Sequence, residues 1–120
     1  MPISSGWMLT SGDVVELDLG VPEGSEAGLV RPAIVVTAQR VLARAPRVIQ
    51  VVPLTRTRRG HGSEVRVDAD ASNGLDRDSA AQCHHIRAVA DLRVRGKLGN
   101  VGPVVLSQVR DTLAAVLDLY

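Results

Sequence analysis

A buried strand is expected at Val48-Ile49-Gln50-Val51-Val52-Pro53-Leu54 (residues 48–54), because this run is rich in β-branched side chains. Pro53 has no backbone N–H to give to a sheet, so the strand must end, bulge or lie at an edge there. We therefore expect Leu54 and Thr55 at a strand terminus, from which polar side chains often reach a pocket. The other elements are predicted from the sequence on either side of this run.

Three further segments are predicted as strands. Arg31-Pro32 leads into a continuous apolar run over residues 33–36, which indicates a central strand. Apolar and acidic residues alternate over residues 14–19, the pattern of a half-buried strand. Residues 64–68 alternate as well, and we expect them to form a hairpin with the strand at 48–54.

The C-terminal third is expected to hold a strand pair or one kinked strand over residues 80–90, and a turn-rich piece over 96–102. A helix is predicted over 103–118, because Pro103 suits a helix start and apolar side chains recur at spacings of three and four. Those side chains are Val105, Val109, Leu113, Val116 and Leu117. The elements together predict a mainly β fold with a C-terminal helix (α+β), a small antiparallel barrel. Residues 1–120 are expected to form a single domain, with an N-terminal extension at 1–11.

The composition narrows the possible functions. Phe is absent, and Trp7 and Tyr120 are the only aromatic side chains, so stacking of bases on aromatic rings is disfavoured. The formal net charge of +1 disfavours a general polyanion binder. Lys97 is the only lysine among 14 Lys and Arg residues. Arginine suits bidentate phosphate recognition, but its abundance could equally reflect genome composition.

The compartment is predicted from cysteine usage and from the N-terminus. Cys83 is the only cysteine, which excludes an intramolecular disulfide and indicates a reducing compartment. Residues 1–9 lack a basic segment and a long apolar run, so no signal peptide is expected. No apolar stretch reaches membrane-spanning length. We therefore expect a cytoplasmic protein without a membrane partner.

Two polar positions are candidates for chemistry. The loop from Gly24 to Gly28 could aim backbone N–H groups at an anion, and Arg31 lies at the mouth of a buried strand. That arginine is either a solvated strand start or a phosphate clamp. Thr55 either ends its strand or presents its hydroxyl to a pocket.

Cys83-His84-His85-Ile86-Arg87 is the third candidate. In a strand, Cys83, His85 and Arg87 would share one face. Two potential ligands do not make a tetrahedral zinc site, and the remaining histidine, His61, lies in a loop. A thiol nucleophile and a histidine that acts as acid, base or reader of a base edge stay open at this point.

The order of several short motifs resembles the MazF/PemK family of toxin endoribonucleases. These motifs are Gly12-Asp13-Val14-Val15, Gly24-Ser25-Glu26, Arg31-Pro32-Ala33-Ile34-Val35-Val36, Val52-Pro53-Leu54-Thr55, Gly74-Leu75, Asp78-Ser79-Ala80, His85-Ile86-Arg87 and Lys97-Leu98-Gly99, followed by a terminal helix. None of them is specific alone, but their order and spacing match from about Gly12 to Leu119.

The resemblance implies an SH3-like barrel that forms a homodimer and cleaves single-stranded RNA at short sequences. It implies a reaction without metal or cofactor that leaves a 2′,3′-cyclic phosphate and a 5′-hydroxyl. It also implies silencing by a cognate MazE-like antitoxin, whose disordered acidic tail occupies the RNA groove.

The resemblance also implies roles for individual residues. It implies that Arg31 and Thr55 are catalytic and that Gly24, Ser25 and Glu26 border the substrate. A fixed guanidinium and a hydroxyl dipole suit that role, because in-line attack by a ribose 2′-OH builds negative charge at phosphorus. Glu26 or His85 is the conceivable proton acceptor, and the sequence does not choose between them. We further expect Arg56, His85 and Arg87 to bind substrate.

Two departures from the family bear on the target sequence. Many relatives carry Gln at the position of His85, and many carry an aromatic residue near Glu16. The connection from Arg56 to Gly62 is basic and is either a solvated loop or an RNA-backbone contact. The rival readings are a CcdB-like toxin that binds DNA gyrase and an inactive relative that binds RNA or a partner.

Overall fold

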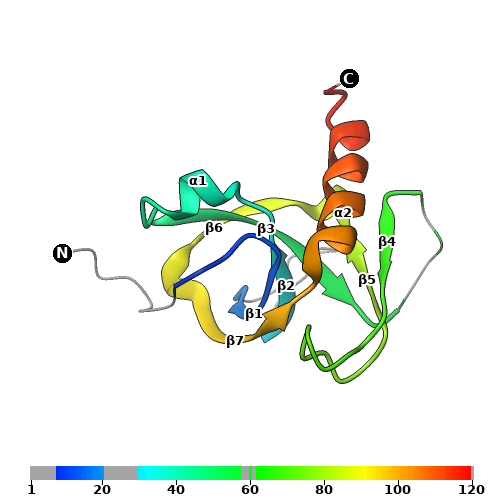
Figure 1. The fold of residues 1–120 in the computed structure, drawn as a ribbon, viewed down its shortest axis with the longest axis horizontal. Helices are drawn as coiled ribbons and strands as arrows, with labels where there is room; N and C mark the ends of the chain where they lie inside the picture. Colours follow the sequence, from blue (N-terminus) through cyan, green and yellow to red (C-terminus); the bar gives the residue numbers. More distant parts are fainter. Residues whose placement is uncertain (1–7, 21–29, 58–59, 61, 120) are drawn as a thin grey trace.

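The computed structural model of this chain describes residues 8–20, 30–57, 60 and 62–119. Figure 1 shows a curved sheet with one long helix standing against it. In chain order the elements are β1 (Asp13–Asp18), β2 (Val30–Val35), α1 (Gln39–Leu42), β3 (Val48–Thr55), β4 (Glu64–Val67), β5 (Ser79–Gln82), the 3-10 turn η1 (Cys83–His85), β6 (Arg87–Ala90), the 3-10 turn η2 (Asp91–Arg93), β7 (Val94–Asn100) and α2 (Gly102–Val116).

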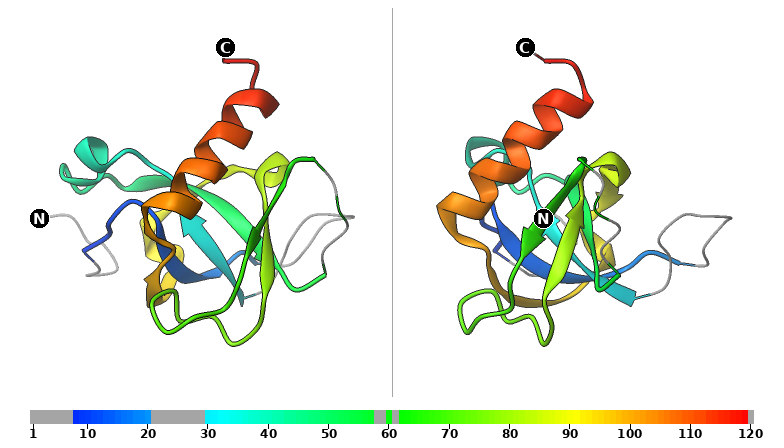
Figure 2. Two further views of the ribbon diagram at one scale, coloured as in Figure 1. Left: turned by 45° about the vertical axis from the view of Figure 1, so that its right-hand side comes forward. Right: turned by 90° about the vertical axis from the view of Figure 1, so that its right-hand side faces the viewer.

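The sheet is antiparallel at every registered pair, and its strand order is β4-β5-β3-β2-β1-β7, with β6 also paired to β3. Within the described residues this path leaves β4 and β7 as its two ends, so the curled sheet is barrel-like without closing. Figure 2 shows the curl from two further sides. The prediction of a mainly antiparallel β fold with a C-terminal helix is confirmed.

Strand β3 is the central strand. On the side away from β2, its partner changes from β6 to β5 at Pro53. Residues 48–51 pair with β6, whereas Leu54 and Thr55 pair with β5. Pro53 falls between these two ladders while it still faces Ala33 of β2. The strand therefore neither ends nor lies at an edge there, because the missing N–H coincides with a gap between partners.

Three sequence predictions about strand pairing and turns were wrong. β4 forms no hairpin with β3, because β5 lies between them and pairs with both. The segment 80–90 contains two strands, but each pairs with β3 and η1 separates them. The expected turn at 96–102 is mostly β7, and its Gly99 reflects close packing, since a Cβ there would collide with the carbonyl of Ser72.

Two hydrophobic clusters fill the interior, one on each side of the sheet. Successive residues of a strand point into different clusters, so Val14 belongs to the first cluster and Val15 to the second. Helix α2 covers the first cluster with Val109 and Leu113, which are 0% and 7% exposed. Val116 and Leu117, also expected in the apolar stripe, are 40% and 50% exposed. The helix itself begins one residue earlier than expected, at Gly102, and ends at Val116.

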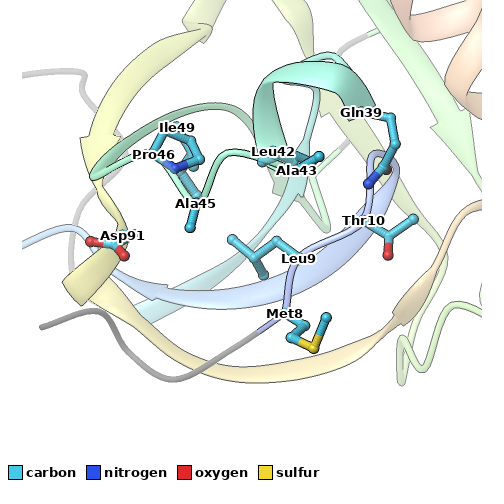
Figure 3. Close-up of a pocket in the computed structure, with 10 residues that line it drawn as sticks. All are labelled: Met8, Leu9, Thr10, Gln39, Leu42, Ala43, Ala45, Pro46, Ile49 and Asp91. Atoms are coloured by element: carbon cyan, nitrogen blue, oxygen red, sulfur yellow. The ribbon is translucent and has the colours of Figure 1, made fainter. Parts of the chain in front are cut away.

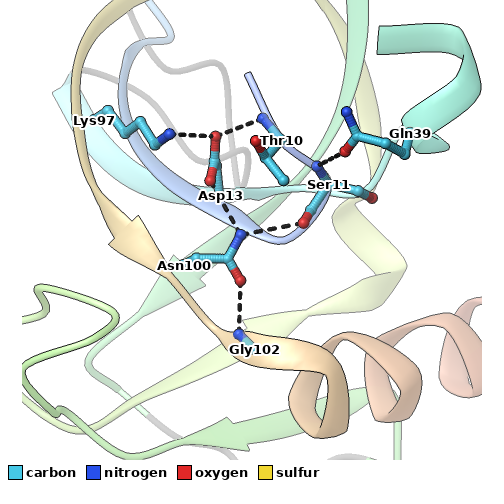
Figure 4. Close-up of polar contacts among 7 residues, drawn as sticks. All are labelled: Thr10, Ser11, Asp13, Gln39, Lys97, Asn100 and Gly102. Carbon is cyan, nitrogen blue, oxygen red and sulfur yellow. Dashed lines mark hydrogen bonds and ion pairs between the residues drawn. The ribbon is translucent and has the colours of Figure 1, made fainter. Parts of the chain in front are cut away.

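A buried polar corner joins the start of β1 to the end of β7 (Figure 4). Asp13 is 1% exposed and accepts hydrogen bonds from the backbone N–H of Thr10 at 2.6 Å and from the side-chain amide of Asn100 at 3.0 Å. The ammonium of Lys97 lies 3.2 Å from the same carboxylate. Asn100 also accepts from the N–H of Gly102 at 2.8 Å, so this corner fixes the start of α2. We call Asp13, Lys97, Asn100 and Thr10 the Asp13 corner.

Candidate functional site

Arg31 and Thr55 lie beyond the same end of the ladder between β2 and β3. Ala33 faces Pro53 in the last registered pair of these antiparallel strands. Arg31 precedes Ala33 by two residues, and Thr55 follows Pro53 by two residues, so both lie just past this last pair. The topology thus gathers the two predicted catalytic residues at one end of the β2–β3 pair.

The hydroxyl of Thr55 is oriented by the turn that follows β3. Thr55 is 8% exposed, and its Oγ1 accepts a hydrogen bond from the N–H of Thr57 at 3.1 Å. The contact from Oγ1 to the carbonyl of Thr57 is long, at 3.5 Å. The hydroxyl proton is therefore weakly held by the protein and can be given to an incoming acceptor.

Arg31 is half-buried near the start of β2. Its cross-strand neighbour on the other side is Leu17 of β1, and Asp18 lies opposite Val30 in the same ladder. Arginine stays protonated at every relevant pH, so Arg31 supplies a fixed positive charge. The guanidinium is anchored on a strand rather than on a loop, which favours a fixed geometry.

Two arginines from the other side of β1 meet Asp18. Arg95 Nη2 donates to the Asp18 carboxylate at 3.0 Å, and Arg93 Nη1 donates to the Asp18 backbone carbonyl at 3.1 Å. The Arg95 hydrogen bond, followed by one from the N–H of Gly20, holds the pKa of Asp18 below its ordinary value. Sequence reasoning missed this group; the only signal was arginine at alternate positions 93 and 95.

Arg56, predicted to bind substrate, is engaged by a carboxylate. It directly follows Thr55, and its Nη2 donates to both oxygens of Asp76 at 3.1 and 2.8 Å. Both side chains are well exposed, at 59% and 73%. Exposed ion pairs of this kind contribute about 0–1 kcal/mol, so an incoming phosphate can compete with Asp76.

The expected shared face of Cys83, His85 and Arg87 was wrong, because Cys83–His85 form the turn η1 rather than a strand. Cys83 points into the core and is 0% exposed, and burial raises the pKa of its thiol to about 11. A thiol with so high a pKa is a poor nucleophile near neutral pH.

His85 is half-buried, and its ring packs edge-on against His84 with centroids 4.2 Å apart. Arg87 begins β6 and pairs with Val51, four residues before Thr55 along β3 and therefore roughly 13 Å away. The topology thus places Arg87 on the strand beside β3 but not next to Thr55.

Several predicted positions lie outside the described residues. Gly24, Ser25 and Glu26 are among them, as are Arg58, Arg59 and His61 of the basic connection. Among the residues that are described, no group of three or more His, Cys, Asp or Glu side chains could hold a metal ion. No helix in the described part of the chain is both long and apolar enough to cross a membrane.

An apolar pocket of about 410 Å³ opens at the opposite end of β3 (Figure 3). Leu42, Ile49 and Leu9 form part of its wall, and Asp91 is the one charged residue in its lining. Ile49 and Thr55 are six residues apart in one strand, which is roughly 20 Å. The pocket is therefore separate from the Arg31–Thr55 end, and its apolar wall does not suit a phosphate backbone.

Comparison with known proteins agrees with the motif order. Residues 10–117 match the family model of the PemK-like, MazF-like toxin of type II toxin–antitoxin systems. The chain is 36% identical over 118 residues to endoribonuclease MazF9 of Mycobacterium tuberculosis, covering 94% of this chain and 99% of that relative.

Solved structures share the fold. MazF of Deinococcus radiodurans superposes with a TM-score of 0.77 at 24% identity, covering 93% of this chain and 98% of that one. A mycobacterial endoribonuclease in complex with its cognate antitoxin gives a TM-score of 0.73 at 23% identity, covering 91% and 94% of the two chains. With the family model spanning most of its length, the chain belongs to the PemK-like, MazF-like toxin family of type II toxin–antitoxin systems.

Proposed function

We propose that this toxin is a metal-independent endoribonuclease that cuts single-stranded RNA with Arg31 and Thr55. As a member of the MazF-like toxin family with an endoribonuclease as its relative, the chain is an RNA-cleaving toxin. The observation that supports the residue assignment is the β2–β3 register, because Arg31 and Thr55 each lie two residues past its last pair, Ala33 with Pro53.

In this proposal the ribose 2′-oxygen attacks the adjacent phosphorus. The 2′-O–P bond forms, the P–O5′ bond breaks, and the products are a 2′,3′-cyclic phosphate and a 5′-hydroxyl. Arg31 stabilises the negative charge that builds on the phosphoryl oxygens, and its charge is already fixed before reaction. The Thr55 hydroxyl donates to a phosphoryl oxygen, since Thr57 already orients its oxygen.

Two protons move in this reaction. The 2′-OH loses its proton to Glu26 or His85, and the choice between them stays open. The departing 5′-oxygen gains a proton, for which the Arg31 guanidinium is the candidate donor. Arg56 and Arg87 bind the RNA backbone, and Arg56 does so by exchanging Asp76 for a phosphate.

The proposed partners follow from the same family. Neighbouring structures are MazE–MazF complexes and an endoribonuclease with its cognate antitoxin. We therefore propose a MazE-like antitoxin with an acidic tail as the partner of this toxin. Its carboxylates would compete with RNA for Arg31 and Arg56, and a homodimer would present two such sites.

The test uses one long single-stranded RNA in EDTA with wild type, Arg31→Ala and Thr55→Ala. Discrete cuts by wild type alone, with cyclic-phosphate ends, would support the assignment. Removing one such electrostatic contact is expected to slow cleavage by about 10²–10³-fold. Intact RNA with wild type would instead favour the gyrase-binding or inactive reading, and cutting that survives both substitutions would place the site elsewhere.

A further inference from the structure

The apolar pocket at the end of β3 remote from Thr55 is used neither by the motifs nor by the proposed reaction (Figure 3). Leu42 and Ile49 of its wall belong to the second hydrophobic cluster, and Leu9 packs against that cluster. The pocket therefore opens directly onto the core. Its volume of about 410 Å³ lies within the range of pockets that hold a small ligand or a large side chain.

Asp91 is the charged residue of the pocket wall, and it is 6% exposed. It begins η2, and its backbone N–H donates to the carbonyl of Arg47 at 2.9 Å. Within the described residues, no hydrogen bond or ion pair engages its carboxylate. A carboxylate at this depth needs a donor, because an unpaired buried acceptor costs free energy. The pocket thus suits an occupant that is mostly apolar and carries a hydrogen-bond donor.

The chain itself has such a group next to the pocket. Trp7 is the only tryptophan of the sequence, and it directly precedes Met8, a lining residue. Its indole is a large apolar ring system with a single N–H donor. The described part of the chain begins at Met8, so Trp7 is the first residue beyond it. Since consecutive Cα atoms are about 3.8 Å apart, the indole is within reach of the pocket.

The exposure of the first described residues indicates which way the side chain at position 7 points. Met8 is 90% exposed and Thr10 is exposed, whereas Leu9 between them is half-buried and packs against the second hydrophobic cluster. In an extended chain, residues two apart lie on one face. Continued by one residue, this alternation predicts that position 7 lies on the same face as Leu9, toward the pocket.

We propose that the indole of Trp7 docks into the apolar pocket and donates its N–H to the Asp91 carboxylate. The docked ring covers Leu42 and Ile49 and removes the pocket wall from water. The hydrogen bond satisfies the buried acceptor. The N-terminal segment then closes the second hydrophobic cluster, as α2 covers the first cluster on the other side of the sheet.

Trp7 is its own probe, because excitation at the red edge of the absorption band reports on it without Tyr120. The emission maximum and acrylamide quenching are measured at several protein concentrations and again in urea. Ala43→Glu places a charge in the pocket wall at an exposed alanine, which a docked indole would have to desolvate. The matched control is Ala71→Glu, at an exposed alanine in the turn between β4 and β5.

Wild-type Trp7 should emit at shorter wavelength than in urea, and acrylamide should quench it several-fold less. Both values should be the same at every protein concentration. Ala43→Glu should move them toward the values in urea, whereas Ala71→Glu should leave them as in wild type. Trp7→Ala should lower the Tm, measured by circular dichroism, by about 5 °C.

The hydrogen bond is tested by a double-mutant cycle on Tm. Trp7→Phe keeps an aromatic ring but removes the donor, and Asp91→Leu removes the acceptor. Trp7→Phe should therefore lower the Tm less in the Asp91→Leu protein than in wild type. Asp91→Asn keeps an acceptor and should retain the coupling. Equal losses on Trp7→Phe in all three proteins would contradict the contact with Asp91.

The inference is overturned if wild-type Trp7 emits and is quenched as in urea, since the pocket is then left to a ligand or a partner. Shielding that persists in Ala43→Glu would place the ring elsewhere, and shielding that fades on dilution would place it against a second copy of the chain. If Ala43→Glu fails to fold, the cycle between positions 7 and 91 decides alone. None of these measurements requires RNA cleavage, so failure of the proposed function would leave them unchanged.

Discussion

Each end of β1 carries an aspartate that forms an ion pair with a cation of β7, and the two aspartates differ in how far they are buried. Asp13 is 1% exposed and its partners, Lys97 and Asn100, close over it. The Asp18 side chain is 35% exposed, and Arg95 beside it is more exposed still. The same pair of strands thus carries a buried polar corner at one end and an exposed ion pair at the other.

The difference shows what burial does to an ion pair. A buried carboxylate must be fully hydrogen-bonded, because each unmet partner costs free energy in the interior. Such a group stabilises the fold and is not available to bind a ligand. An exposed pair contributes little to stability, so its cation can be given to a ligand at low cost. We therefore assign the Asp13 corner to the fold, whereas the exposed pair of Asp18 and Arg95 contributes little to it.

The largest expected effect comes from opening the Asp13 corner. Asp13→Ala removes the acceptor for Thr10 and Asn100 and leaves the ammonium of Lys97 without its partner. We expect a loss of about 3 kcal/mol in the free energy of unfolding, measured by urea denaturation. Asp18→Ala is the matched change at the other end of β1, and it should cost clearly less, because the ion pair of Asp18 with Arg95 is exposed. Equal losses in the two variants would remove the distinction between the ends.

A glycine near the Asp13 corner offers a second test of how tightly that end is packed. Gly99 precedes Asn100, and a Cβ at this position would meet backbone atoms of Ser72 and Asn73. Gly99→Ala should therefore lower the free energy of unfolding by about 1–3 kcal/mol through overpacking. Gly96, also in β7, has open space around its Cβ position and serves as the control. A fully stable Gly99→Ala protein would show that this end of β7 can shift freely.

The smallest effect concerns pH. The contact with Arg95 and the N–H of Gly20 lower the pKa of Asp18 in the folded protein, so the ionised carboxylate favours folding. This contribution is present above the unfolded pKa of about 3.9 and is lost as pH falls through the folded value. In urea unfolding between pH 2 and 6, the stability difference between wild type and Asp18→Asn should shrink toward the acid end. A difference that grows with acidity would contradict the assignment.

The predictable parts of the molecule are those with strong local patterns. The β-branched run at 48–54 and the helical spacing of Val109 and Leu113 predicted a buried strand, β3, and the C-terminal helix that covers the first hydrophobic cluster. The pairing of β5 between β3 and β4 could not be predicted, because periodicity identifies a strand but not its partner. Gly99 was predicted to lie in a turn for the same reason: it packs closely against Ser72, a residue distant in sequence.

The candidate site was likewise predictable from the sequence only in part. Arg31 and Thr55 were singled out by motif order, and both lie just past the same end of the β2–β3 ladder, while their catalytic roles stay predictions. The contacts of Arg93 and Arg95 with Asp18 were not predicted, since they join residues more than seventy positions apart. The roles of Gly24, Ser25 and Glu26 also stay predictions, as these residues lie outside the described part of the chain.

The most direct test of the account is a double-mutant cycle between Arg31 and Thr55 in single-turnover cleavage of RNA in EDTA. Wild type, Arg31→Ala, Thr55→Ala and the double variant are compared at saturating enzyme. If both residues act on one phosphate across the β2–β3 pair, the double variant should be about as slow as the slower single variant. Multiplied losses, which independent sites produce, would contradict the claim that these two residues form one catalytic centre.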